Sequence, residues 1–191
     1  MDKTSLPWYT ASKDYAAMED DMSLSFLPSL LAPDITAITP AVLSRRGIRL
    51  LMLDFDNTIV TYYSDIPTQK VEDWFKTMKQ AGITLCVVSN SKSDRVQRFC
   101  DERDLDCIIR AKKPRGKGIR ECLARYDIPA CQAALAGDQI FTDTLGANAQ
   151  GVTSILVKAI HNHRFLFKCR HLMELPFIIL AWRRRIENEQ S

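Results

Sequence analysis

From about residue 47 to residue 159, short apolar runs alternate with amphipathic segments. The apolar runs lack the regular polar alternation of a half-exposed strand, which is typical of strands buried on both faces of a sheet. The segments between them repeat apolar residues every three or four positions, as the core-facing side of a helix does. This order predicts an α/β fold, a three-layer α/β/α Rossmann-like domain with a parallel five-stranded sheet.

Capping and stop signals set the ends of the predicted elements. One helix stops at Gly82, and Ser93 suits the N-cap of the next. Thr39 and Pro40 suit the start of a short helix, in a lead-in that we otherwise expect to be loop. Strands are predicted at 48–53, 83–88, 107–109, 133–136 and 152–157, and helices at 67–81, 93–103, 117–126 and 142–150.

Polar residues cluster directly after four of the apolar runs. In open parallel sheets, binding sites form at the carboxyl ends of the strands, so we expect these clusters to meet at one edge. In chain order they are Asp54-Phe55-Asp56-Asn57-Thr58, Ser89-Asn90-Ser91, Lys112-Lys113-Pro114, and Gly137-Asp138-Gln139 with Thr142-Asp143.

Four aspartates are expected at this edge, namely Asp54, Asp56, Asp138 and Asp143. Like charges this close raise one another's pKa or require a cation, and Mg²⁺ suits carboxylates combined with a substrate phosphate and water. A nearby lysine and serine supply the positive charge and the donor that a phosphoryl group needs. One carboxylate can then attack phosphorus, and a second can protonate the leaving oxygen and activate water. The pattern favours Mg²⁺-assisted phosphoryl transfer.

In this order, the four motifs resemble those of the haloacid dehalogenase-like (HAD) hydrolases. The segments 53–58, 88–90, 110–114 and 136–143 are most similar to the YqeG-type phosphatases of subfamily IIIA, which are related to the phosphatidylglycerophosphate phosphatases. The resemblance covers residues 27–160. It implies a Mg²⁺-dependent phosphomonoester phosphatase that works through an aspartyl-phosphate. The implied substrate is phosphatidylglycerophosphate, an anionic phospholipid, at the cytoplasmic face of the membrane.

The resemblance also implies a role for each motif residue. Asp54 is expected to be the nucleophile and Asp56 the general acid and base. Lys113 is expected to neutralise the phosphate and the nucleophile, and Lys112 and Lys117 compete with it for that role. The implied phosphate-binding residues are Thr58, which also orders the catalytic loop, Ser89, Asn90 and Lys113. The implied metal ligands are Asp54, Asp56 through its backbone carbonyl, Asp138, and Asp143 either directly or beside a ligand.

The spacing of the motifs leaves no room for an inserted cap domain. Residues 56–89 are filled by one predicted helix and one strand, and residues 89–113 are filled likewise. A capless site is open, so it can accept a head group presented by a membrane or a phosphate on a macromolecule.

Composition and charge indicate which classes of partner the protein is expected to bind. The chain has 191 residues, a formal net charge of +3 and 46% hydrophobic residues, as a globular protein does. Segments 110–125 and 158–185 each carry seven basic residues against one acidic residue, which favours anionic partners. No nucleic-acid motif supports a nucleic-acid partner, and no apolar run is long enough to span a bilayer. The six cysteines form no C-x-x-C pair and indicate reduced thiols in a cytoplasmic protein, either free or peripheral on the membrane.

The segments at the two ends are predicted separately from the domain at 27–160. Residues 1–26 are polar and lack a signal-peptide pattern, which predicts a flexible extension. Residues 161–191 mix basic and aromatic side chains, which suits a helical segment packing on the domain or on a membrane. His161, His163 and His171 lie beside arginines there, and we favour surface histidines over a metal cluster.

Two other functions are consistent with the sequence. A phosphatase of a soluble phosphoester, such as a nucleotide or sugar phosphate, would use the same motifs. A non-catalytic interaction module could also retain the fold. Neither the open site nor the basic segments separate these alternatives from a lipid phosphatase.

Overall fold

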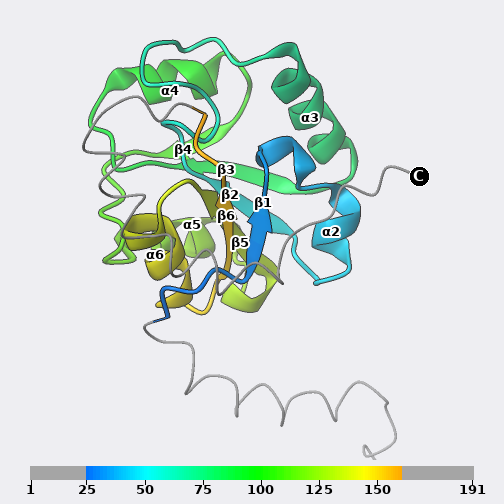
Figure 1. Ribbon diagram of the computed structural model, residues 1–191, viewed down its shortest axis with the longest axis vertical. Coiled ribbons are helices and arrows are strands. Elements are labelled where there is room, and N and C mark those ends of the chain that lie inside the picture. Colours follow the sequence, from blue (N-terminus) through cyan, green and yellow to red (C-terminus); the bar gives the residue numbers. More distant parts are fainter. Residues whose placement is uncertain (1–24, 161–191) are drawn as a thin grey trace, which may run out of the picture.

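Six parallel strands form one sheet in the order β1-β6-β5-β2-β3-β4, with helices on both faces (Figure 1). This computed structural model describes residues 25–160, and the predictions for residues 1–24 and 161–191 lie outside the described residues. The three-layer fold is confirmed, with six strands rather than five.

The strands are β1 (Leu30–Ala32), β2 (Leu50–Leu53), β3 (Thr84–Val88), β4 (Asp106–Ile108), β5 (Ala133–Gly137) and β6 (Thr153–Val157). The helices are α2 (Pro40–Ser44), α3 (Gln69–Gln80), α4 (Asp94–Asp101), α5 (Lys117–Tyr126) and α6 (Leu145–Asn148), with short turns η2 (Ile35–Ala37), η3 (Ala130–Gln132) and η4 (Ile140–Thr144).

Alternate side chains of the central strands enter two separate cores. In β2, Leu51 and Leu53 pack in the core beneath α3 and α4, whereas Leu50 and Met52 pack in the core beneath α5 and α6. Figure 1 shows the sheet between these two helical layers. Because both faces are covered, every residue of the strand is buried, and the strand appears in the sequence as an uninterrupted apolar run.

The segment before the first predicted strand was expected to be mostly loop, and this prediction was wrong for the three residues of β1. Its three residues pair with Ile155–Val157 of β6 at the edge of the sheet. Pro28 and Pro33 flank it, and proline, which has no backbone N–H, is tolerated in sheets mainly at edges and strand ends. A three-residue run between prolines has no recognisable strand period, so sequence patterning missed it.

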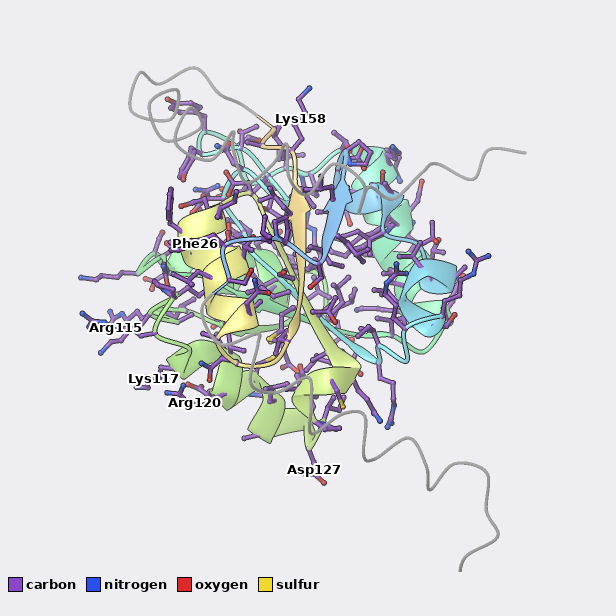
Figure 2. All side chains as sticks on the ribbon, turned by 60° about the horizontal axis from the view of Figure 1, so that its bottom comes forward. Phe26, Arg115, Lys117, Arg120, Asp127 and Lys158 are labelled. Carbon is purple, nitrogen blue, oxygen red and sulfur yellow. The ribbon has the colours of Figure 1, made fainter. Side chains whose placement is uncertain are left out.

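The chain order brings all the motif loops to one edge of the sheet. β3 and β4 extend the sheet on one side of β2, whereas β5, β6 and β1 extend it on the other. Lys158, after β6, and Asp127, at the end of α5, lie toward opposite ends of the sheet (Figure 2). In such sheets the crevice beside the central strand, where the order reverses, holds the ligand site.

Among residues 25–160, no helix has the length and apolar character needed to cross a bilayer.

Gly118 provides a test of how closely α5 packs on the loop that follows β4. A Cβ at Gly118 would lie 2.4 Å from Cβ of Ala111 and 2.7 Å from its Cα. Gly118→Ala is therefore expected to destabilise the domain by about 1–3 kcal/mol through overpacking, as measured by urea unfolding. Ala124→Ser, at an exposed position of the same helix, should change stability by less than about 0.5 kcal/mol. Equal unfolding midpoints for Gly118→Ala and the unsubstituted chain would contradict this packing.

Candidate active site

A buried lysine joins two buried aspartates at the carboxyl edge of the sheet. Lys113 Nζ lies 2.6 Å from Asp54 Oδ1 and 2.7 Å from Asp143 Oδ1. The Lys113 side chain is 1% exposed. Burial by itself would lower the pKa of Lys113, but the Asp143 and Asp54 carboxylates outweigh it and raise the pKa above its ordinary value. Lys113 is therefore held in its charged form.

The backbone of the loop between β4 and α5 separates two adjacent lysines. Arg110 and Lys112 adopt left-handed φ angles of 54° and 57°. Asn90 fixes the turn, because its amide donates to the Lys113 carbonyl at 3.0 Å and accepts from the Lys113 N–H at 2.7 Å. Lys112 and Lys117 are exposed, so Lys113 is the one of the three candidates that the fold brings to the aspartates. Asn90, expected beside the phosphate, contacts the Lys113 backbone.

Asp54 and Asp56 follow β2 on either side of Phe55. The Phe55 ring is fully buried, and its centroid lies 5.0 Å from that of Phe99. Asn57 has a left-handed φ of 61° and turns the chain directly after the second aspartate. Because the intervening aromatic side chain anchors the loop in the core, both carboxylates lie at the edge of the sheet, the first buried and the second half-buried.

The two carboxylates have different electrostatic surroundings. Burial raises the pKa of Asp54 to about 7, against the opposing effect of Lys113. Burial also raises the pKa of Asp56, and here Arg95 opposes it. Asp54 is therefore paired with a fully buried cation, whereas Asp56 is paired with a cation at the rim of the site.

Three carboxylates form a cluster that fits a divalent cation. Asp54, Asp138 and Asp143 each offer an oxygen atom within 4.8 Å of the others, and all three residues are buried. Lys113 offsets only part of their negative charge. An all-oxygen donor set with excess negative charge suits Mg²⁺. The Asp56 carboxylate is outside this cluster, and the contribution of its backbone carbonyl to the metal site stays a prediction.

Asp143 reaches the cluster from a π-helical turn. The predicted helix at 142–150 is instead divided into this turn, η4, and the short helix α6. The Gln139 N–H donates to Asp143 Oδ2 at 3.1 Å, which leaves Oδ1 for Lys113. A Cβ at Gly137 would lie 2.4 Å from Asp143 Cγ. The carboxylate therefore packs directly over the glycine, and a larger residue there would displace it.

Ser89 and Thr58 are both buried at the same edge. Ser89 Oγ accepts a hydrogen bond from the Ser91 N–H at 3.1 Å and remains able to donate its own proton. Thr58 Oγ1 has no hydrogen-bond partner among the described residues. Their binding of phosphate stays a prediction, and both hydroxyl groups have hydrogen-bonding capacity for it.

Arg95 is a residue of the site that sequence analysis did not single out. Its Nη1 lies 3.0 Å from Asp56 Oδ1, and its Nη2 donates to the Thr61 carbonyl at 2.8 Å. Its Nε pairs with Asp65, and the guanidinium carbon lies 4.9 Å from the centroid of the Phe55 ring. In sequence, Arg95 is one of several charged residues at the start of an amphipathic helix, which is also the pattern of a solvated helix face.

Comparisons with known proteins identify a family and agree with this fold. A family model described as mitochondrial PGP phosphatase matches residues 20–160. Probable phosphatase YqeG of Bacillus subtilis (strain 168) is 34% identical over 132 residues, which cover 69% of this chain and 77% of that protein. Phosphatidylglycerophosphate phosphatase 1, chloroplastic/mitochondrial, of Arabidopsis thaliana is 25% identical over 170 residues, or 83% of this chain. The chain spans 49% of that relative's length.

One solved structure shows the likeness of fold. The crystal structure of an uncharacterized protein from Listeria monocytogenes serotype 4b matches with a TM-score of 0.50 at 14% identity. The match covers 62% of this chain and 85% of that one. At this identity the likeness concerns the fold alone.

The carboxylate cluster leads to a prediction about metal binding. Adding MgCl₂ is expected to raise the thermal unfolding midpoint, because a ligand that binds only the folded state stabilises it by about 2.7 kcal/mol at 100 times its Kd. Asp138→Asn should abolish this rise. In EDTA the same variant should unfold at or above the midpoint of the unsubstituted chain, because one buried repulsion is removed. KCl at equal ionic strength is the control, and an undiminished Mg²⁺ effect in Asp138→Asn would argue against this site.

Proposed function

The chain belongs to the family described as mitochondrial PGP phosphatase, among the HAD phosphatases, and on that premise we propose that it is a Mg²⁺-dependent phosphatidylglycerophosphate phosphatase that works through an aspartyl-phosphate. The observation that carries this proposal is the buried Asp54–Lys113–Asp143 arrangement, with Asp56 at its rim. It combines an oriented carboxylate, a fixed cation and a second carboxylate at the rim of the site.

In the first half-reaction, an Asp54 carboxylate oxygen attacks the phosphorus atom, and the bond from phosphorus to the ester oxygen breaks. Lys113 orients Asp54 and offsets the repulsion between its carboxylate and the phosphate. Asp56 gives its proton to the leaving alkoxide, which requires the protonated acid that its raised pKa favours. Ser89 and Thr58 donate hydrogen bonds to the phosphoryl oxygens.

In the second half-reaction, the Asp56 carboxylate takes a proton from a water molecule. The water oxygen attacks the phosphorus atom, the bond from phosphorus to Asp54 breaks, and inorganic phosphate leaves. When bound by Asp54, Asp138 and the Asp56 carbonyl, with Asp143 beside them, Mg²⁺ supplies positive charge to the nucleophile and the phosphate. Asp143 also fixes Lys113 through both half-reactions.

The open surroundings of the site support a lipid substrate. Between Asp56 and Ser89 the chain forms only a loop, α3 and β3, and between Ser89 and Lys113 only α4, β4 and their loops, so neither interval holds an inserted domain. A phosphate that remains attached to a bilayer can reach such a site without being enclosed. The family description and the name of the Arabidopsis relative support the same substrate.

Replacing the nucleophile tests the covalent mechanism. Asp54→Asn is expected to lower phosphate release from p-nitrophenyl phosphate by about 10³-fold or more while leaving the circular dichroism spectrum unchanged. Rapid quenching and mass spectrometry should find phosphorylated Asp54 in the unsubstituted chain and no phosphorylated residue in the variant. Asp127→Asn, at the opposite end of the sheet, is the matched control and should retain full activity (Figure 2). A phosphoryl group on a different residue would contradict the assignment.

The substrate proposal is tested with phosphatidylglycerophosphate in detergent micelles against nucleotide and sugar monophosphates. We expect kcat/KM for the lipid to exceed that for the soluble esters by at least about tenfold. EDTA should abolish hydrolysis of both, and added Mg²⁺ should restore it. Faster turnover of a soluble ester would favour a phosphatase of soluble metabolites, and retained hydrolysis in EDTA would exclude dependence on the metal.

A further inference from the structure

The exposed large hydrophobic side chains of the described residues gather at the edge that carries the active site. They are Ile66, which is 83% exposed, Tyr63, 74%, and Ile160, 45%. The first two lie in the loop between β2 and α3, and the third follows β6, where its N–H donates to the Asn57 carbonyl at 3.0 Å. Single exposed apolar residues are ordinary, but here all three border one site.

The loop that carries Tyr63 and Ile66 is held in place from beneath. Arg95 donates to the carbonyls of Thr61, at 2.8 Å, and Ser64, at 3.4 Å, and these residues lie on either side of the tyrosine. The same guanidinium pairs with Asp65, which adjoins the isoleucine. The apolar tip is thus displayed by an anchored loop.

Exposed basic residues also lie at this edge of the sheet. Lys158 projects from the end of the sheet at which β6 finishes (Figure 2). The exposed aspartates of the edge are balanced in part, because Asp65 pairs with Arg95 and Asp34 lies 3.5 Å from a lysine, while Asp94 occupies the first turn of α4. Several exposed basic residues in the loops that follow β3, β4 and β6 form no ion pair within residues 25–160, and those nearest the ends of these strands are Lys92, Arg110, Lys112 and Lys158.

We define the docking rim by its exposed apolar and basic residues, which are Tyr63, Ile66, Ile160, Lys92, Arg110, Lys112 and Lys158. We infer that this docking rim binds to the surface of an anionic lipid bilayer, with Tyr63 and Ile66 inserted among the head groups and the active site facing the membrane. The inference rests on the proposed function, because a site turned toward a bilayer serves a phosphate carried by a lipid.

The make-up of the rim favours a bilayer over a protein partner. Apolar and aromatic side chains set among basic residues are typical of segments that lie in a membrane interface. Each basic residue near an anionic surface strengthens binding by about fivefold. The centre of a protein–protein interface is instead depleted of charge, and here the charged and apolar residues are interspersed.

The test compares binding of the full chain to phosphatidylcholine vesicles with and without phosphatidylglycerol, measured by flotation. Ile66→Glu is expected to weaken binding to the anionic vesicles by at least about tenfold. The control Ala81→Glu adds the same charge at the exposed far end of α3 and should bind as the unsubstituted chain does. Lys112→Gln should weaken binding by about fivefold. Turnover of soluble p-nitrophenyl phosphate by Ile66→Glu should be unchanged, which shows that the site is intact.

The outcomes separate this inference from the proposed function. Vesicle binding by Ile66→Glu equal to that of the unsubstituted chain, or equally weakened in Ala81→Glu, would overturn the docking surface, and so would binding that does not depend on phosphatidylglycerol. Loss of binding confined to Ile66→Glu and Lys112→Gln supports it. Failure to hydrolyse phosphatidylglycerophosphate in micelles would overturn the proposed substrate, whatever the vesicles show.

Discussion

The ammonium group of Lys113 lies between the carboxylates of Asp54 and Asp143, away from water. A buried ion is costly unless it is paired, so each of these groups makes the burial of the others possible. The contact requires three distant segments to meet: the end of β2, the loop after β4, and the turn η4. These segments meet because β2 has parallel strands on both sides, so that the carboxyl ends of all the strands lie at the same edge of the sheet.

Two aspartates of the same chemical type acquire different properties from one intervening residue. Phe55 is drawn into the core, and the chain on either side of it meets different cations. Asp54 faces a lysine that is itself buried, whereas Asp56 faces Arg95 at the rim. Burial raises the pKa of both carboxyl groups, and a different cation opposes it in each case, Lys113 for Asp54 and Arg95 for Asp56. The proposed division of roles within this short loop therefore depends on where each carboxyl group lies and on the cation that it contacts.

Sequence analysis predicted the fold and the grouping of the motifs because both depend on strong local signals. Strands buried on both faces leave uninterrupted apolar runs, and polar clusters mark where those runs end. Strand β1 was missed because three residues between prolines carry no period. Arg95 was missed for a different reason: many of its bonds go to backbone carbonyl groups, which every residue possesses and which leave no trace in the sequence. The π-helical turn was missed because its extra residue barely disturbs the helical spacing.

The adjacent lysines at 112 and 113 have the same side chain, and yet one is solvated and the other is in the interior. Two features of the loop distinguish them. The residues on either side of Ala111 have left-handed backbone conformations, and the side chain of Asn90 forms two hydrogen bonds with the backbone of Lys113. Shortening or lengthening this loop by one residue would hardly change the amino-acid composition. It would, however, move the ammonium group of Lys113 away from the buried aspartates and into solvent. The length of the loop, as much as the identity of its residues, is therefore under chemical constraint.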